Sequence, residues 1–128
     1  MDLYKDIQVY WIHSPNQLKS FKYILKKLNN TNYDKITYKN AHWSGISSDS
    51  FPNPMAWFDS PEDSDITPLL LYHLIDDKYH ILQTANGNHF NTYSIIYITS
   101  SIDFYSFFKK CSLELFQELY SKLNFIYL

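Results

Sequence analysis

The chain has 128 residues, a formal net charge of −2 and 45% hydrophobic residues, which together predict one soluble domain spanning residues 1–128. Its single cysteine, Cys111, excludes an intramolecular disulfide and a cysteine-based zinc site, and it suits a reducing compartment. The chain contains no arginine, so it lacks the bidentate side chain that reads guanine edges and clamps phosphates. We therefore expect no direct binding of nucleic acid.

The apolar runs of the chain are short. The longest, at residues 69–71 and 95–98, are strand-sized and fall well below the roughly 20 apolar residues that a membrane helix needs. The first residues also lack the basic region and apolar run of a secretory signal. These features predict a cytoplasmic protein with no membrane partner, and we expect a monomer.

The first forty residues predict a strand, a helix and a second strand. Residues 6–13 are rich in Val, Ile, Tyr and Trp, which favour extended structure. Ser14 followed by Pro15 indicates the start of a helix, and an Asn-rich segment at residues 29–32 indicates its end. Residues 35–40 predict the second strand. The apolar stripe expected on the buried face of the helix comprises Leu18, Phe21, Leu25 and Leu28.

A long segment rich in serine, residues 42–54, predicts a loop, and long loops inside compact domains are often functional. Three large aromatic side chains lie in this segment or just after it. The sequence leaves two interpretations of them open: they pin the loop to the core, or they anchor a partner, since aromatic residues dominate interface hot spots. These residues are Trp43, Trp57 and Phe58.

Residues 69–100 predict an antiparallel meander of three strands. A turn is expected at residues 76–78, and a tight hairpin is expected at Asn86 and Gly87, because both residue types tolerate positive φ. This part of the chain therefore predicts an antiparallel sheet. The expected strands are residues 69–75, 79–85 and 91–100.

The C-terminal residues 103–124 predict helical structure that is capped by Ser101 or Asp103. Their two apolar stripes fit either one helix with a wide buried face or two helices separated by a break. We favour a break near Cys111, with Ser112 capping the second helix. Helices on one face of an antiparallel sheet give the expected fold class, an α+β domain.

Charge is distributed unevenly along the chain. Lysines dominate the first forty residues, whereas acidic residues dominate the middle. This pattern is typical of solvated faces, or of a negative surface that steers a basic partner by long-range attraction. If that partner were a nuclease, the carboxylates would stand where nucleic-acid phosphates bind. The candidate contact residues are Asp59, Glu62, Asp63, Asp65, Asp76 and Asp77.

The common catalytic and cofactor motifs are missing from the sequence. Two distant glycines cannot build a phosphate loop, no G-x-S-x-G, H-E-x-x-H or C-x-x-C occurs, and the acidic run lacks the spacing of a calcium loop. We therefore expect no catalytic residue, no cofactor and no metal. The alternative is a small acid–base enzyme or ligand-binding domain that uses His73 and His80, if neighbouring strands place the two imidazoles opposite each other.

The segment Ile95-Ile96-Tyr97-Ile98-Thr99-Ser100-Ser101-Ile102-Asp103-Phe104-Tyr105-Ser106-Phe107-Phe108 resembles the end of SUKH-type immunity proteins, where a strand with a polar end precedes a short aromatic helix. Such proteins neutralise bacterial toxins by binding them. The resemblance implies a non-enzymatic inhibitor of the wider class that protects cells against contact-dependent or polymorphic toxins. Its expected partner is a cognate toxin domain, basic in charge, whose active site would be covered by the acidic and aromatic surface.

Overall fold

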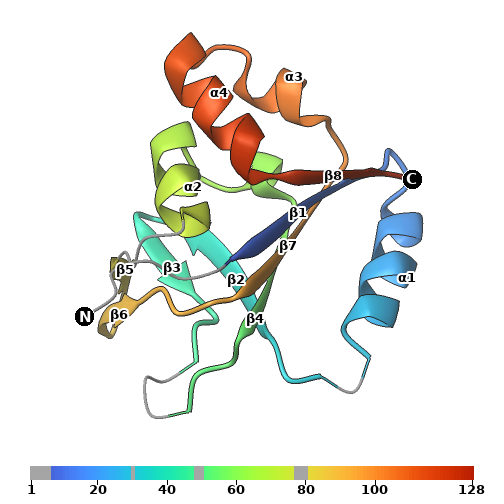
Figure 1. The fold of residues 1–128 in the computed structure, drawn as a ribbon. Helices are drawn as coiled ribbons and strands as arrows, with labels where there is room; N and C mark the ends of the chain where they lie inside the picture. The colour runs from blue at the N-terminus through green and yellow to red at the C-terminus, as the bar shows by residue number, and fades with distance from the viewer. Residues whose placement is uncertain (1–6, 30, 48–50, 77–80) are drawn as a thin grey trace.

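The computed structural model describes residues 7–29, 31–47, 51–76 and 81–128. Within these ranges the chain forms an eight-stranded sheet, four α-helices and one short 3-10 helix (Figure 1). The strands are β1 (Gln8–His13), β2 (Asp34–Lys39), β3 (His42–Ser44), β4 (Met55–Asp59), β5 (Ile81–Thr84), β6 (Gly87–Phe90), β7 (Ile95–Ser100) and β8 (Asn124–Tyr127). The helices are α1 (Gln17–Lys27), η1 (Pro61–Asp63), α2 (Pro68–Ile75), α3 (Phe104–Phe108) and α4 (Leu113–Lys122).

The sheet is mixed, so the prediction of an antiparallel sheet is wrong, although the mixture of helices and strands is confirmed. The strand order is β6-β5-β3-β2-β4-β7-β1-β8. Strands β2, β4, β7, β1 and β8 form one parallel block. Antiparallel pairing is confined to β2 with β3 and to β5 with β6. Strands that run parallel need long crossover connections, and three connections between strands of this block contain helices: β1 to β2, β4 to β7, and β7 to β8.

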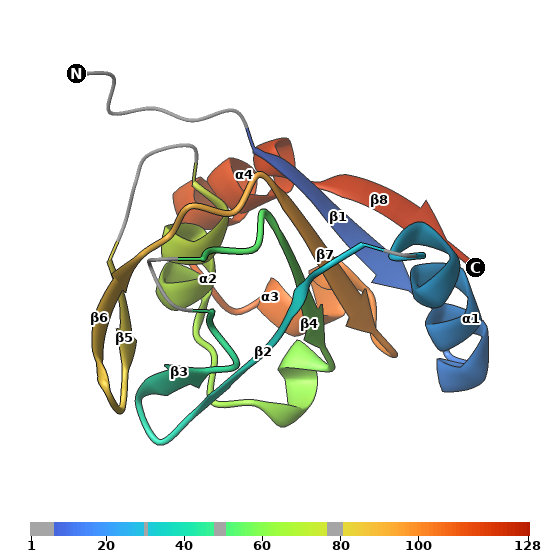
Figure 2. The ribbon, with the colours of Figure 1, turned by 90° about the horizontal axis from the view of Figure 1, so that it is seen from below.

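Helices cover both faces of the sheet, which corrects the expectation of helices on one face (Figures 1 and 2). On one face, Ile24 of α1 and the C-cap residue Leu28 share a core with Trp57 of β4. On the other face, α2, α3 and α4 pack on a larger core that includes Ala56 and Phe58. Successive residues of β4 therefore serve opposite cores, as the alternation of a strand requires. Burial on both faces also explains why the central strands β4 and β7 are almost continuously apolar.

The predicted β1 and α1 both form, but α1 presents a different face to the sheet from the one expected. Asn16 caps the helix in place of Ser14. The buried positions within α1 are Ser20 and Ile24, so the face is narrower and rotated from the predicted stripe. The members of that stripe that lie exposed are Leu18 and Leu25.

Residues 69–75 belong to helix α2, so the first strand of the predicted meander is wrong. The Thr67 hydroxyl accepts a hydrogen bond from Leu70 N at 3.3 Å. Pro68 occupies the first turn, where its missing N–H leaves no broken bond. A short apolar run suits a buried helix and a buried strand equally well, and the cap with its proline is what distinguishes the two.

The hairpin predicted at Asn86 and Gly87 is confirmed by the antiparallel pairing of β5 with β6, in which Thr84 lies opposite Gly87. The third strand of the predicted meander does not pair with that hairpin. It becomes β7, which lies between β4 and β1 and runs parallel to both. The expected turn and strand start at residues 77–80 lie outside the described residues.

The predicted break in the C-terminal helix is confirmed. Asp103 Oδ1 accepts a hydrogen bond from Ser106 N at 2.8 Å and begins α3. Ser112 Oγ accepts one from Leu115 N at 3.2 Å and begins α4. The sequence reading missed β8, which follows α4 and joins the sheet beside β1. No helix in the part of the chain that the structure describes is long and apolar enough to cross a bilayer.

Candidate functional site

The carboxyl ends of β4, β7 and β1 meet at one edge of the parallel block. The chain leaves β1 toward α1 on one face and leaves the neighbouring β7 toward α3 and α4 on the other (Figure 2). Where the connections of adjacent parallel strands diverge in this way, a crevice opens, and open α/β sheets bind their ligands there. We call the cavity at this point the carboxyl-edge pocket.

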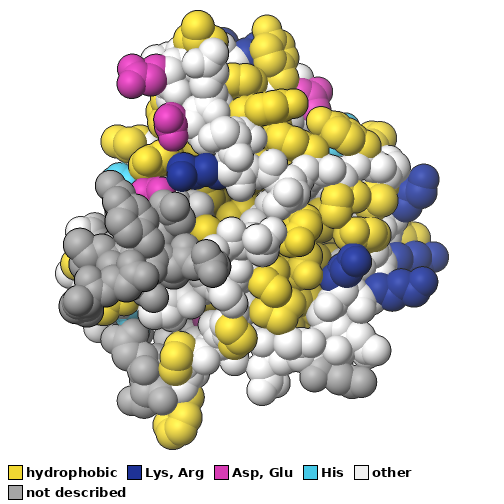
Figure 3. Space-filling model, in the orientation of Figure 1, with side chains coloured by type: hydrophobic (Ala, Val, Ile, Leu, Met, Phe, Trp, Pro, Cys, Tyr) yellow, Lys and Arg dark blue, Asp and Glu magenta, His cyan; other side chains and the backbone are white. Residues whose placement is uncertain are grey.

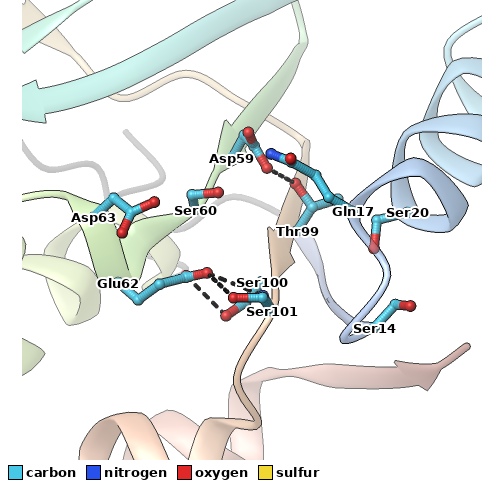
Figure 4. Close-up of a pocket in the computed structure, with 10 residues that line it drawn as sticks. All are labelled: Ser14, Gln17, Ser20, Asp59, Ser60, Glu62, Asp63, Thr99, Ser100 and Ser101. Atoms are coloured by element: carbon cyan, nitrogen blue, oxygen red, sulfur yellow. Dashed lines mark hydrogen bonds between the residues drawn. The ribbon is translucent and has the colours of Figure 1, made fainter.

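The carboxyl-edge pocket has a volume of about 160 Å³. Three segments line it: the β1–α1 junction, the end of β4 with η1, and the end of β7 (Figure 4). Every lining side chain is polar. The lining residues are Ser14, Gln17, Ser20, Asp59, Ser60, Glu62, Asp63, Thr99, Ser100 and Ser101.

Asp59 is oriented by a chain of two hydrogen bonds that begins in the core. The indole Nε1 of Trp57 donates to Thr99 Oγ1 at 2.8 Å. The same Thr99 hydroxyl donates to Asp59 Oδ1 at 2.7 Å. Thr99 is buried and its hydroxyl has one hydrogen, so the indole fixes which way that hydrogen points. The Asp59 carboxylate is thereby held at the wall of the pocket.

Glu62 is fixed by the last residue of β7 and by the residue that follows it. Ser101 donates to Glu62 Oε1 twice, from its backbone N at 3.0 Å and from its hydroxyl at 2.8 Å. The Ser100 hydroxyl lies 2.9 Å from Glu62 Oε2. Hydrogen bonds to a carboxylate are stronger than neutral ones, so these bonds tie η1 to β7 and hold the Glu62 side chain in a defined position.

The backbone at the pocket takes a sharp turn at Ser60. This residue has φ 54° and ψ 60°, in the left-handed region that a serine adopts at a cost. Its N donates to Thr99 O at 2.7 Å, and its carbonyl accepts from Asp63 N at 2.9 Å. These two bonds hold the turn, and the turn brings Glu62 and Asp63 back over the strand ends.

Ser20 lies on α1, where it lines the pocket on the side opposite Glu62 and Asp63 (Figure 4). It is 3% exposed, and its hydroxyl has no hydrogen-bond partner among the described residues. Buried hydroxyls are normally hydrogen-bonded, so this one requires an explanation. Trp11 Nε1 is in the same situation, but Trp11 belongs to the large core on the other face of the sheet.

The electrostatic character of the pocket is negative. Its lining includes the carboxylates of Asp59, Glu62 and Asp63 and no lysine. The positive end of the α1 dipole lies beside it. On the view of Figure 3 the lysines gather over α1. Within the described ranges, no three His, Cys, Asp or Glu side chains are grouped so that they could hold a metal ion.

The six acidic residues predicted as contacts fall in different places. Asp59, Glu62 and Asp63 meet at the pocket, as described. Asp65 lies beyond the pocket lining, where its Oδ2 accepts from Asn40 N at 2.9 Å and supports the β2–β3 turn. Asp77 lies outside the described residues.

Asp76 is buried, so it does not form part of an exposed acidic surface. Its Oδ1 lies 3.2 Å from Nζ of Lys122, a residue of α4. Asp76 is also the C-cap of α2, and its backbone N donates a hydrogen bond to Tyr72 O at 2.9 Å. The ion pair joins α2 to α4 and is structural.

The three aromatic residues predicted as anchors are core residues. Trp43, Trp57 and Phe58 are 3%, 4% and 0% exposed. The Trp43 ring packs edge-on against Phe58 with centroids 5.5 Å apart, and Trp57 packs edge-on against Phe21 at 5.4 Å. Of the two interpretations that the sequence left open, burial supports the structural one, and it leaves these side chains no exposed face for a partner.

The pairing of His73 with His80 across two strands does not form, because His73 lies on helix α2. His73 is half-buried, and its ring stacks edge-on with Tyr72 at 6.3 Å. His80 lies outside the described residues. The alternative site therefore loses the geometry on which it was based.

The sequence reading missed most of the pocket's hydroxyl groups. The signal that marks them is the position of small polar residues directly after apolar strands, as with Ser14 after β1 and Ser100 at the end of β7. In the sequence, the polar end of β7 carries only a resemblance to a family and no sign of a pocket. Because the strand order was unknown, nothing in the sequence indicated that these residues face Asp59.

No protein-family model matches the chain, and no curated protein sequence matches it. The fold and the pocket define its class: a protein built on a mixed sheet with helices on both faces and an acidic crevice at the carboxyl edge of the parallel strands.

Proposed function

We propose that this protein is a cytoplasmic inhibitor that binds another protein, an immunity protein that neutralises a cognate toxin by covering the toxin's active site. The contact surface is the carboxyl-edge pocket and its rim. The observation that carries the proposal is the convergence of Asp59, Glu62 and Asp63 on one edge, where the lining holds no opposing lysine.

The carboxylates of this edge are suited to binding a basic partner. Asp59 and Glu62 are already fixed by hydrogen bonds to Thr99 and Ser101, so little side-chain entropy is lost when a partner docks. Asp63 is exposed at the rim and contributes to the field that a partner meets first. A negative, preorganised surface speeds the association of a basic protein and excludes acidic competitors.

Charge reversal at the rim tests this proposal. The chain is expressed with the product of the gene immediately upstream, which is the candidate toxin, and their association rate is measured at several salt concentrations. Asp63→Lys should slow association by up to about tenfold at low salt and weaken its salt dependence. Asp63 contributes only its backbone N to the η1 turn, so the fold should survive the change.

The matched control is Glu118→Lys, which makes the same charge change at an exposed position of α4 outside the pocket. It should leave the association rate nearly unchanged. If both variants slow association equally, the effect belongs to net charge and the proposed surface is wrong. If the upstream product does not bind the wild-type chain, the assignment as its immunity protein fails.

A further inference from the structure

We propose that the carboxyl-edge pocket is a binding site for a guanidinium group. Where that group is an arginine side chain of a bound toxin, the inference rests on the function proposed above. A small guanidinium compound that diffuses freely would use the same chemistry. The inference depends on the charge, the size and the unsatisfied hydroxyl of the pocket.

The charge of the pocket favours a cation. Asp59, Glu62 and Asp63 line it, and no lysine does. The first turn of α1 also borders the pocket, and a helix N-terminus by itself attracts anions. Three carboxylates against one partial positive charge reverse that preference, so a phosphate or sulfate would be repelled.

The size of the pocket favours a small planar group. A volume of about 160 Å³ is well below the roughly 300–1,000 Å³ of pockets that hold drug-sized ligands or cofactors. The pocket volume is close to that of a cavity of about 150 Å³ that holds one benzene ring. A guanidinium with its methylene stem fits this space, whereas a whole nucleotide does not.

The hydrogen-bonding groups of the pocket call for a ligand with several donors. The carboxylates of Asp59 and Glu62 are acceptors, and each is held in place by its own donor, Thr99 for Asp59 and Ser101 for Glu62. A bound group with several donors can therefore bind both carboxylates. Ser20, on α1, is buried at the pocket wall, and its hydroxyl lacks a partner among the described residues. A guanidinium presents five N–H donors in a rigid plane, enough to reach both carboxylates and the Ser20 oxygen together.

Titration of the isolated chain with ethylguanidinium chloride tests the site without any partner protein. Two-dimensional amide NMR at constant ionic strength follows Ser14, Ser20 and Ser101. We expect saturable shifts at these amides with a dissociation constant in the millimolar range, which is appropriate for so small a ligand. Shifts that are spread over the surface, or that do not saturate, would overturn the proposal.

Two variants separate the proposed contacts. Asp59→Asn should weaken ethylguanidinium binding about tenfold or more, and Ser20→Ala should weaken it about twofold to tenfold, in line with a charged and a neutral hydrogen bond. Glu118→Gln removes the same charge as Asp59→Asn but lies outside the pocket, so it should leave binding unchanged. Unchanged binding in Asp59→Asn, with amide dispersion showing a folded chain, would overturn the site.

Further probes identify the ligand chemistry and its source. Sodium sulfate or calcium chloride binding at the same amides as tightly as ethylguanidinium would overturn the preference for guanidinium. N-acetyl-arginine amide that binds as well as ethylguanidinium supports an arginine side chain as the source, whereas much tighter binding of agmatine supports a free small molecule. Since these measurements need no toxin, the guanidinium site and the immunity function can fail independently.

Discussion

The hydrogen-bond chain from Trp57 through Thr99 to Asp59 makes a quantitative prediction. Thr99→Val replaces a hydroxyl by a methyl of nearly the same shape, so no cavity forms. The Trp57 residue is 4% exposed, and its indole N–H then has no acceptor. An unsatisfied buried donor costs about 1–3 kcal/mol. Asp59 is half-exposed and regains water for its lost bond, so it adds little.

Urea unfolding followed by circular dichroism measures this cost. With an m-value of about 1.5 kcal/mol per molar, a loss of about 2 kcal/mol lowers the midpoint by about 1.3 M. The m-value itself should not change, because the buried surface is the same. Thr99→Ser keeps the hydroxyl and should recover most of the lost stability.

A double-mutant cycle with Trp57→Phe isolates the hydrogen bond. In the phenylalanine background the buried donor no longer exists, so Thr99→Val should cost less than in the wild type by about 1 kcal/mol or more. If Thr99→Val lowers the free energy of unfolding by the same amount in both backgrounds, the indole and the hydroxyl are not coupled. The proposed orientation of Asp59 from the core would then be refuted.

Three further predictions concern stability. Lys122→Met should lower the free energy of unfolding by up to about 3 kcal/mol in a urea titration, because it removes a charged partner of buried Asp76. Burial, followed by the hydrogen bond to Asp34, raises the pKa of Tyr93, so stability should fall as pH rises above 10, and Tyr93→Phe should flatten that alkaline loss in thermal melts. The hydrogen bond from the Ser106 backbone N lowers the pKa of Asp103, so the charged Asp103 side chain stabilises the fold above pH 3.8 and stabilises it less as the pH falls below that value. Asp103→Ala should therefore lower the free energy of unfolding by about 1 kcal/mol at pH 7 and by less at pH 2, measured by urea titration at the two pH values.

The sequence predicts local structure well wherever one short-range signal dominates. The cap at Ser112, which separates α3 from α4, and the turn at Asn86, which joins β5 to β6, are both predictable. Each depends on only a few neighbouring residues. Helix α2 has no such clear signal, because its sequence is apolar at nearly every position and shows no helical periodicity, although only Leu71, Leu74 and Ile75 are buried. There the cap at Thr67 and the proline after it were the better evidence.

The strand order is beyond local signals. β7 follows the β5–β6 hairpin in the chain, and consecutive strands usually pair, which is why a meander was expected. In the structure β7 pairs with β1, some 87 residues earlier for His13 and Ser100, and with β4. The energetic reason is burial on both faces: Ile96 and Ile98 contact one core and Tyr97 the other, and only a central position satisfies both.

The same two-sided burial explains why the acidic residues were easier to identify than the pocket they form. Asp59 ends β4 and Glu62 follows it in η1, and a cluster of carboxylates is visible in the sequence. Their partners Thr99 and Ser101 lie about 40 residues away and meet them only because β4 and β7 are parallel neighbours that end at the same edge. Trp57 shows the consequence most clearly: its ring is buried on the α1 face, so it contributes to the edge through one indole N–H and not as an exposed anchor.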